Sequence, residues 1–137
     1  MIKIVFPALV AAISTVTVAK DLAISDVPVV VREAFFQSYP GSMVEKWDFD
    51  EDDNLFEIDA RKDNLEIEAK YDSKGQLIEL KEDIPFDRLP ASVEEKIAKQ
   101  WPGASIIGIN RKVKNGQVYF DVGLKIKGKH RNVQLRE

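Results

Sequence analysis

One stretch of the chain occurs twice, and this repetition constrains the fold more than any other feature. The first copy spans residues 27–41 and the second spans residues 89–103, an offset of 62 residues without a gap. Each copy opens with an aliphatic residue followed by Pro and closes with an aromatic residue followed by Pro and Gly. The sequence therefore predicts two similar structural units in tandem.

Each copy has the pattern of a short amphipathic helix with defined ends. Pro28 and Pro90 favour helix starts, because the N–H that Pro lacks has no partner there. The Pro that closes each copy disfavours a helical conformation in the residue before it, so the helices should end near Tyr39 and Trp101. Apolar residues recur at helical spacing between these ends: Val27, Val30, Val31, Ala34 and Phe35 in the first copy, and Leu89, Val93, Ile97 and Trp101 in the second.

Alternating apolar and polar residues follow each helix and predict antiparallel strands with one buried face and one wet face. The first half should contain strands at residues 43–49, 55–61, 65–71 and 76–81, and the second half at 105–113, 117–126 and 130–136. Asn115-Gly116 is a strong two-residue hairpin signal. Eight residues are predicted to be buried: Phe35, Phe56, Ile58, Ile67, Val93, Ile97, Phe120 and Val122.

The predicted fold class is α+β, with two tandem repeats that each pack one helix on a three- to four-stranded antiparallel sheet. The repeats are assigned to residues 27–83 and 89–137, joined by a linker that Pro85 interrupts. A unit of about 50 residues buries little apolar surface by itself. We therefore expect the two halves to form one continuous structure.

The N-terminal residues have the layout of a cleavable secretory signal. Lys3 supplies a positive charge, residues 4–13 are mainly apolar, and Thr17-Val18-Ala19 forms a small-x-small site. This layout predicts cleavage after residue 19 and a mature chain that starts at Lys20. The alternative is a membrane anchor, but Pro and hydroxyl residues interrupt the apolar run, which is short for a spanning helix.

The residue set offers little for catalysis. The chain has no Cys and a single His, His130, which lies between Lys129 and Arg131. A nucleophilic site needs a base beside a nucleophile and a group that orients the base. No Gly-x-Ser-x-Gly motif, phosphate-binding loop or basic-aromatic nucleic-acid motif is present. We expect no enzyme activity, no cofactor and no nucleic-acid partner.

An acidic run resembles the first part of a calcium-binding loop but lacks the rest. Asp48, Asp50 and Asp52 have the required spacing. The full pattern needs Gly at its sixth position and Glu at its twelfth, where this chain has Asp53 and Asp59. A solvated hairpin tip is the preferred interpretation, and a weak cation site at these three residues is the alternative.

Four motifs resemble the PepSY-like family of periplasmic proteins, whose fold is similar to that of beta-lactamase inhibitors. They are Tyr39-Pro40-Gly41 after the first helix, Trp47 in the strand that follows, Phe56-Glu57-Ile58, and Tyr71-Asp72-Ser73-Lys74-Gly75. The resemblance extends over both halves and implies tandem helix-plus-sheet repeats, a Gram-negative envelope location and a non-enzymatic binding role. The second half departs from the pattern, because Ile109 stands where the first half has Trp47 and no second Asp-x-x-Gly turn occurs.

Charge is distributed unevenly along the chain. Residues 20–83 include 18 acidic and 8 basic residues, a net charge of −10, whereas residues 84–137 include 5 acidic and 11 basic residues, a net charge of +6. The two halves can attract each other within one molecule. They can also steer a charged partner, because such fields raise association rates.

The polar face of the predicted sheet is the candidate binding surface. We expect a non-catalytic, secreted or periplasmic protein-binding or inhibitor-like module whose partner is an unidentified envelope protein. The alternatives are a small-ligand or cation-binding envelope protein, or an enzyme with an unrecognised site, which a deep apolar pocket would favour. The candidate residues are Glu57, Asp59, Arg61, Glu66, Glu68 and Lys70 in the first half, and Tyr119, Asp121 and Lys125 in the second.

Overall fold

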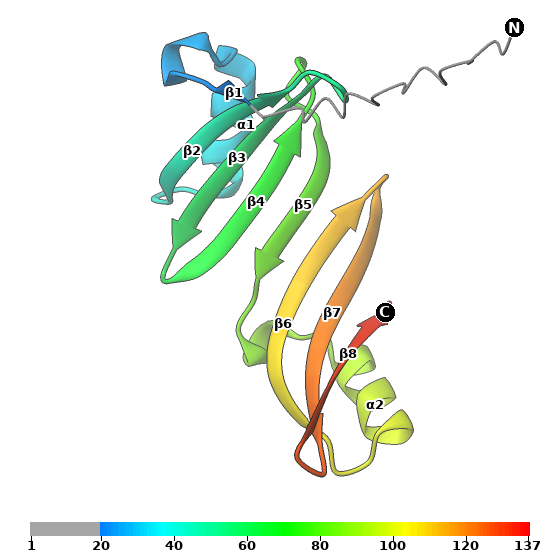
Figure 1. Ribbon diagram of the computed structural model, residues 1–137. Coiled ribbons are helices and arrows are strands. Elements are labelled where there is room, and N and C mark those ends of the chain that lie inside the picture. Colours follow the sequence, from blue (N-terminus) through cyan, green and yellow to red (C-terminus); the bar gives the residue numbers. More distant parts are fainter. Residues whose placement is uncertain (1–19) are drawn as a thin grey trace, which may run out of the picture.

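The computed structural model describes residues 20–137, so the predicted signal peptide lies outside the described residues. In this part of the chain no helix is long and apolar enough to cross a bilayer. Two helices lie against one antiparallel sheet (Figure 1), which confirms the predicted α+β class. The helices are α1 (Val29–Ser38) and α2 (Ala91–Gln100), and short 3-10 turns precede them at Ile24–Asp26 and Phe86–Arg88.

The sheet has eight strands in the order of the sequence, and every neighbouring pair is antiparallel. The strands are β1 (Lys20–Asp21), β2 (Met43–Asp50), β3 (Leu55–Lys62), β4 (Leu65–Tyr71), β5 (Leu77–Asp83), β6 (Ser105–Lys114), β7 (Gln117–Ile126) and β8 (Lys129–Leu135). The sequence predicted a sheet for each repeat. The structure instead joins the strands of both halves, because β5 pairs with β6 from Glu79↔Lys114 to Asp83↔Asn110.

Both helices have the same chemistry at their ends. Pro28 and Pro90 cap the N-termini, and the Pro28 carbonyl accepts hydrogen bonds from the N–H groups of Val31 (3.0 Å) and Arg32 (3.2 Å). The N–H groups of Tyr39 and Trp101 close the last turns. The helices therefore end where the sequence predicts, one residue before each aromatic.

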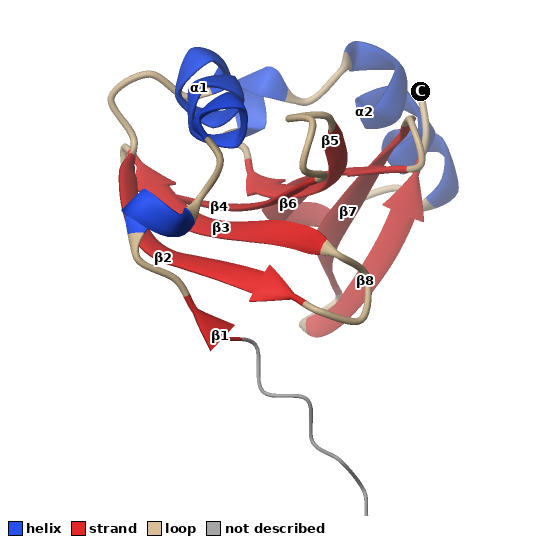
Figure 2. Ribbon diagram, turned by 90° about the horizontal axis from the view of Figure 1, so that it is seen from above, coloured by secondary structure: helices blue, strands red, loops and turns tan. Residues whose placement is uncertain are grey.

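The helices lie on the same face of the sheet (Figure 2), and each covers its own hydrophobic core. The first core packs Val31 and Phe35 of α1 against β2–β5, and the second packs Val93 and Ile97 of α2 against β6–β8. Seven of the eight residues predicted to be buried are buried. Phe56 is half-buried, because it lies beside the hairpin turn at the start of β3, where its ring packs on Phe49 at a centroid distance of 4.8 Å.

The two repeats share one irregularity that the sequence analysis did not predict. The register of β2 shifts between Val44 and Lys46, and that of β6 shifts between Ile106 and Gly108. The bulged residues are therefore Glu45 and Ile107, which are related by the same offset of 62 residues as the helices. A bulge turns the side chain of its extra residue relative to the normal alternation.

Candidate functional site

The face of the sheet opposite α1 and α2, here called the open face, carries all nine candidate residues. In β3 and β4 the candidates alternate with buried residues of the first core, and in β7 they alternate with Phe120, Val122 and Leu124 of the second core. Since successive side chains of a strand point to opposite faces, the candidates lie away from the helices. β5 and β6 lie between the two groups of candidates.

A ladder of alternating charges crosses the open face from the first repeat to the second. The Lys70 ammonium is 2.7 Å from a Glu57 carboxylate oxygen and 4.0 Å from one of Glu79. The Lys114 ammonium is 3.7 Å from the other Glu79 oxygen. The hydrogen bond to Glu57 raises the pKa of Lys70, so this lysine stays charged. The ladder thus fixes the directions of four side chains on four adjacent strands.

Arg61 holds a second group of charges together. Its Nε is 2.8 Å from a carboxylate oxygen of Glu45, the bulged residue of β2, and its Nη2 is 2.6 Å from one of Glu66 on β4. All three side chains are about half-exposed. Arg61 and Glu66 are therefore partners of each other, and a binding protein would have to compete with exposed ion pairs of small net strength.

Asp59 and Glu68 lie opposite each other between these two groups. Partial burial raises the pKa of Asp59, and the nearby charge of Glu68 raises it further. Lys46 is the cross-strand neighbour of Asp59 on β2, but its ammonium lies 2.7 Å from Asp48 and 3.3 Å from Asp21. Within residues 20–137, Asp59 and Glu68 form no ion pair.

The candidates of the second repeat have different surroundings. Arg136 lies over the Tyr119 ring, 4.5 Å from its centroid, and donates a hydrogen bond of 2.5 Å to the phenol oxygen. Asp121 forms an ion pair with Lys112 and accepts a hydrogen bond of 3.0 Å from the Gln134 amide. Lys125 is exposed and lies opposite His130 of β8.

The acidic side chains at the β2–β3 turn bind other groups of the same chain. Asp48 is buried and bound to Lys46, and one carboxylate oxygen of Asp50 accepts hydrogen bonds from the N–H groups of Asp52 (3.0 Å) and Asp53 (3.2 Å). This geometry is that of a capped turn. In residues 20–137 no three His, Cys, Asp or Glu side chains converge in a way that could hold a metal ion.

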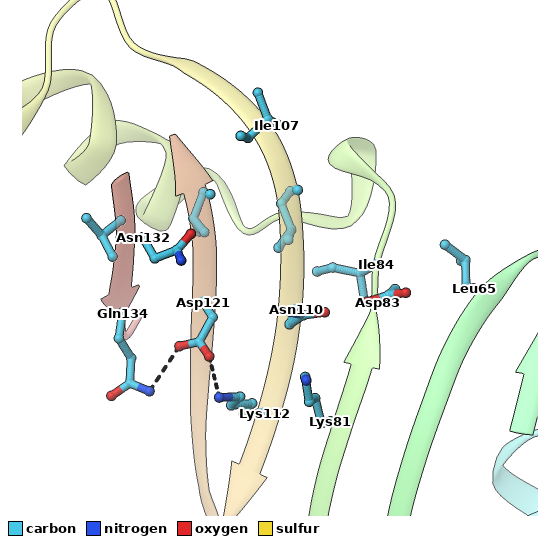
Figure 3. A pocket seen from close by; sticks show the side chains of 15 residues that line it. Leu65, Lys81, Asp83, Ile84, Ile107, Asn110, Lys112, Asp121, Asn132 and Gln134 are labelled. Atoms are coloured by element: carbon cyan, nitrogen blue, oxygen red, sulfur yellow. Dashed lines mark hydrogen bonds and ion pairs between the residues drawn. The ribbon is translucent and has the colours of Figure 1, made fainter. Parts of the chain in front are cut away.

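Two hollows on the open face include residues that the sequence analysis missed. One, of about 740 Å³, lies over β5–β8, and Figure 3 shows Lys81, Asn110, Lys112, Asp121 and Asn132 around it. The other, of about 500 Å³, lies over β3–β6 beside the charge ladder. The alternation of apolar and polar residues in β5 already indicated that Glu79 and Lys81 lie on the open face. Gly108 and Gly123 form the floor of the larger hollow, here called the glycine floor. Their pairing depends on the strand register, which no local sequence pattern predicted.

Comparisons with known proteins agree with this architecture. A family model described as "Putative beta-lactamase-inhibitor-like, PepSY-like" matches the chain twice, over residues 14–79 and 69–132. No curated protein matches the chain.

Several solved structures of similar fold come from Bacteroides species. A DUF2874 family protein of Bacteroides uniformis has a TM-score of 0.55 and 17% identity over 79% of this chain and 80% of its own. A BLIP-like protein of Bacteroides fragilis has a TM-score of 0.55 and 14% identity, over 77% and 76% of the two chains. A Bacteroides eggerthii protein described as a "putative periplasmic" protein has a TM-score of 0.50 and 15% identity, over 78% and 88%. Because the family model covers most of the sequence in two tandem matches, this chain belongs to the beta-lactamase-inhibitor-like, PepSY-like family.

Proposed function

We propose that this protein is a non-catalytic, inhibitor-like module of the bacterial envelope that binds a partner protein through its open face. One observation carries the proposal: charged and polar side chains predominate on β3–β7, on the side of the sheet that the helices leave uncovered. Family membership supports the inhibitor-like class.

The shape of the open face favours a protein over a small molecule. The two hollows described above are wide, and charged and amide side chains make up most of the lining of the smaller one and about half of the lining of the larger one. Small-molecule sites are usually enclosed and mostly apolar, whereas protein interfaces combine a polar rim with a few anchors. The alternative of a small-ligand or cation-binding protein has less support on this surface.

The charges of the open face favour a partner with a matching pattern. Acidic side chains dominate on β3 and β4, whereas Lys112, Lys114 and Lys125 lie on the strands of the second repeat. A partner with a basic region and an acidic region at the corresponding distance would be steered and oriented by this pattern.

The test is a charge reversal on the open face with a matched control on the helix face. The mature chain would capture its partner from an envelope extract, and the affinity for the purified partner would then be measured at several salt concentrations. We expect E57K/E66K to weaken binding by about tenfold or more and to change its salt dependence.

The control variant, E33K/E94K, makes the same change in net charge at exposed positions of α1 and α2. It should leave the affinity close to that of the unchanged protein. Thermal melts of both variants must show that the fold is retained. Equal binding by E57K/E66K and the unchanged protein would move the site elsewhere, first to the acidic turn at residues 50–54.

The envelope location is part of the proposal. The predicted signal at residues 1–19 supports it, together with the family and the description of the Bacteroides eggerthii protein. Protein purified from its native envelope should have the intact mass of a chain that starts at Lys20. A mass that includes residues 1–19 would contradict cleavage and favour a retained anchor.

A further inference from the structure

The two bulges place different chemistry at the same position of the two repeats. In the first repeat, the bulged Glu45 lies beside Arg61 of the neighbouring strand, and the two form an ion pair of 2.8 Å. In the second repeat the bulged residue is Ile107, and the β7 residue that pairs beside the bulge is Gly123, where the first repeat has Asp59. A charged bulge beside a carboxylate in one repeat thus corresponds to an aliphatic bulge beside a missing side chain in the other.

Ile107 leans over Gly123 on the open face. A Cβ atom built on Gly123 would lie 3.1 Å from Cγ1 of Ile107 and 3.6 Å from the side-chain oxygen of Asn132. Gly123 pairs with Gly108 on β6, so two adjacent positions of the open face have no side chain. The result is the hollow of about 740 Å³, with Ile107 at one end and Lys81 and Lys112 toward the other (Figure 3).

Ile107 is an unusual residue for this surface. It is 51% exposed, whereas the candidate residues around it are charged or polar. Buried anchors near the centre of an interface usually carry much of the binding energy, and such anchors fill pockets in the partner's surface. A hollow with one aliphatic wall and a backbone floor suits an aliphatic or aromatic side chain.

The charges around the hollow indicate what must flank that side chain. The two carboxylates at its rim are engaged: Asp121 with Lys112 and Gln134, and Asp83 with the N–H of Glu66 at 3.2 Å. In the described part of the chain Lys81 forms no ion pair, and the second repeat carries a net charge of +6. Acidic residues beside the anchor would therefore be favoured.

We propose that the Ile107–Gly123 hollow is the anchor site of the open face and receives an aliphatic or aromatic side chain at the tip of an acidic loop of the partner protein. This inference rests on the proposed function, because it assumes that the open face binds protein. Beyond the proposed function, it identifies the part of the open face that contributes most to the affinity and the chemistry of the partner segment that binds there.

The decisive experiment fills the hollow with charged side chains. The variant I107E/G123R replaces the aliphatic wall and the bare backbone position by a Glu and an Arg, without changing the net charge. Gly123 does not have the left-handed backbone that would exclude a side chain. The matched control, E45I/R61G, removes the ion pair at the bulge of the first repeat, also without changing the net charge, and leaves the hollow intact. I107S removes the aliphatic wall alone, in case the double variant fails to fold.

The probe is a phage library of randomised, disulfide-closed peptide loops selected on the unchanged protein. We expect enrichment of loops with Leu, Ile, Met, Phe or Trp at the tip next to Asp or Glu. A synthetic copy of an enriched loop should bind I107E/G123R about tenfold or more weakly and bind I107S more weakly, whereas E45I/R61G, which alters the open face outside the hollow, should lose clearly less affinity than I107E/G123R. Amide spectra of each variant would verify folding.

The outcomes separate this inference from the proposed function. Loops that bind I107E/G123R and I107S as well as the unchanged protein, but lose affinity for E57K/E66K, would overturn the anchor site and leave the open face as the binding surface. Enrichment of basic tips, or of tips without an apolar residue, would also overturn it. If no loop is enriched, or enriched loops are insensitive to every open-face variant, both proposals are contradicted.

Discussion

Glu82 of β5 and Arg111 of β6 lie opposite each other on the helix-covered face, with 3.2 Å between the guanidinium Nη1 and a carboxylate oxygen. The other oxygen of Glu82 accepts a hydrogen bond of 3.0 Å from the hydroxyl of Tyr39, the residue that directly follows α1. Glu82 is only 6% exposed. One buried carboxylate therefore joins the helix of the first repeat to the first strand of the second.

Replacement of Arg111 by Met should leave this carboxylate with Tyr39 as its remaining partner. Because Arg111 is itself partly exposed, we expect a loss of about 2 kcal/mol in the free energy of unfolding, measured by urea denaturation. The double variant E82M/R111M should recover part of this loss, since it leaves no buried charge. As a control, K114M breaks an exposed pair and should cost less than about 1 kcal/mol. Equal losses in R111M and K114M would show that the buried Glu82–Arg111 pair contributes no more to stability than an exposed pair.

Tyr39 should make the stability of the protein sensitive to alkaline pH. Burial raises the pKa of Tyr39 above its usual value of 10.0, and the charge of Glu82 raises it further. A group with a raised pKa in the folded state contributes stability below the unfolded pKa, and this is lost as the pH rises toward the folded pKa. The free energy of unfolding should therefore fall above about pH 10.

The variant Y39F tests this origin by urea denaturation between pH 9 and pH 11. Its stability should fall less steeply over this range than that of the unchanged protein. Some decline should remain, because burial also raises the pKa of Tyr71. Parallel curves for the two proteins would show that Tyr39 is not the responsible group.

Replacement of Asp59 by Asn should stabilise the protein at neutral pH. The pKa of Asp59 is raised above its usual 3.8 by burial and by Glu68, so the charged form is disfavoured in the folded state. The penalty is absent below the unfolded pKa and appears as the pH rises through the folded pKa. Because Asp59 is only partly buried, we expect a gain of at most about 1 kcal/mol at pH 7 and none at pH 3. A gain of the same size at both pH values would point to a cause other than its charge.

The turn between β4 and β5 should be unusually intolerant of a side chain at Gly75. Its φ is +79°, and a Cβ atom there would lie 2.9 Å from the backbone oxygen of Val30 in α1. Gly116 has a similar φ of +74° but nothing within 4 Å. Both Ala variants should lose about 1–2 kcal/mol from the left-handed backbone. G75A should lose more in a thermal or urea melt, because the turn must also move away from the helix. Equal losses would show that this contact is easily relieved.

Local signals allowed most element boundaries to be predicted. Pro28, Pro90 and the aromatic-Pro-Gly triplets determine the helix ends through their own backbone restrictions, and strict alternation gave the bounds of β4 and β7 as the structure has them. The same alternation placed the nine candidates on the open face. β1 was missed, because two residues are too few to show a period.

Local sequence signals did not predict the pairing of strands that are distant in the sequence. No turn sets the register of β5 against β6, because a helix intervenes between them, so neither the continuous sheet nor the Glu82–Arg111 pair was predicted. The charge ladder and the glycine floor of the hollow depend on that pairing and on the β6 bulge. The sequence shows that Ile107 occupies the repeat position of Glu45. Only the bulge shows that Ile107 lies beside Gly123 on the open face.

The order of the strands has a consequence for how the chain folds. In residues 20–137 each strand pairs only with strands next to it in the sequence, and only the β1–β2 and β5–β6 pairings must close over a helix. Short closures cost little chain entropy, and sheets made from them form faster than sheets that wait for distant segments. A chain that emerges from its N-terminal end can therefore add strands in order of appearance, each on an edge that is already in place.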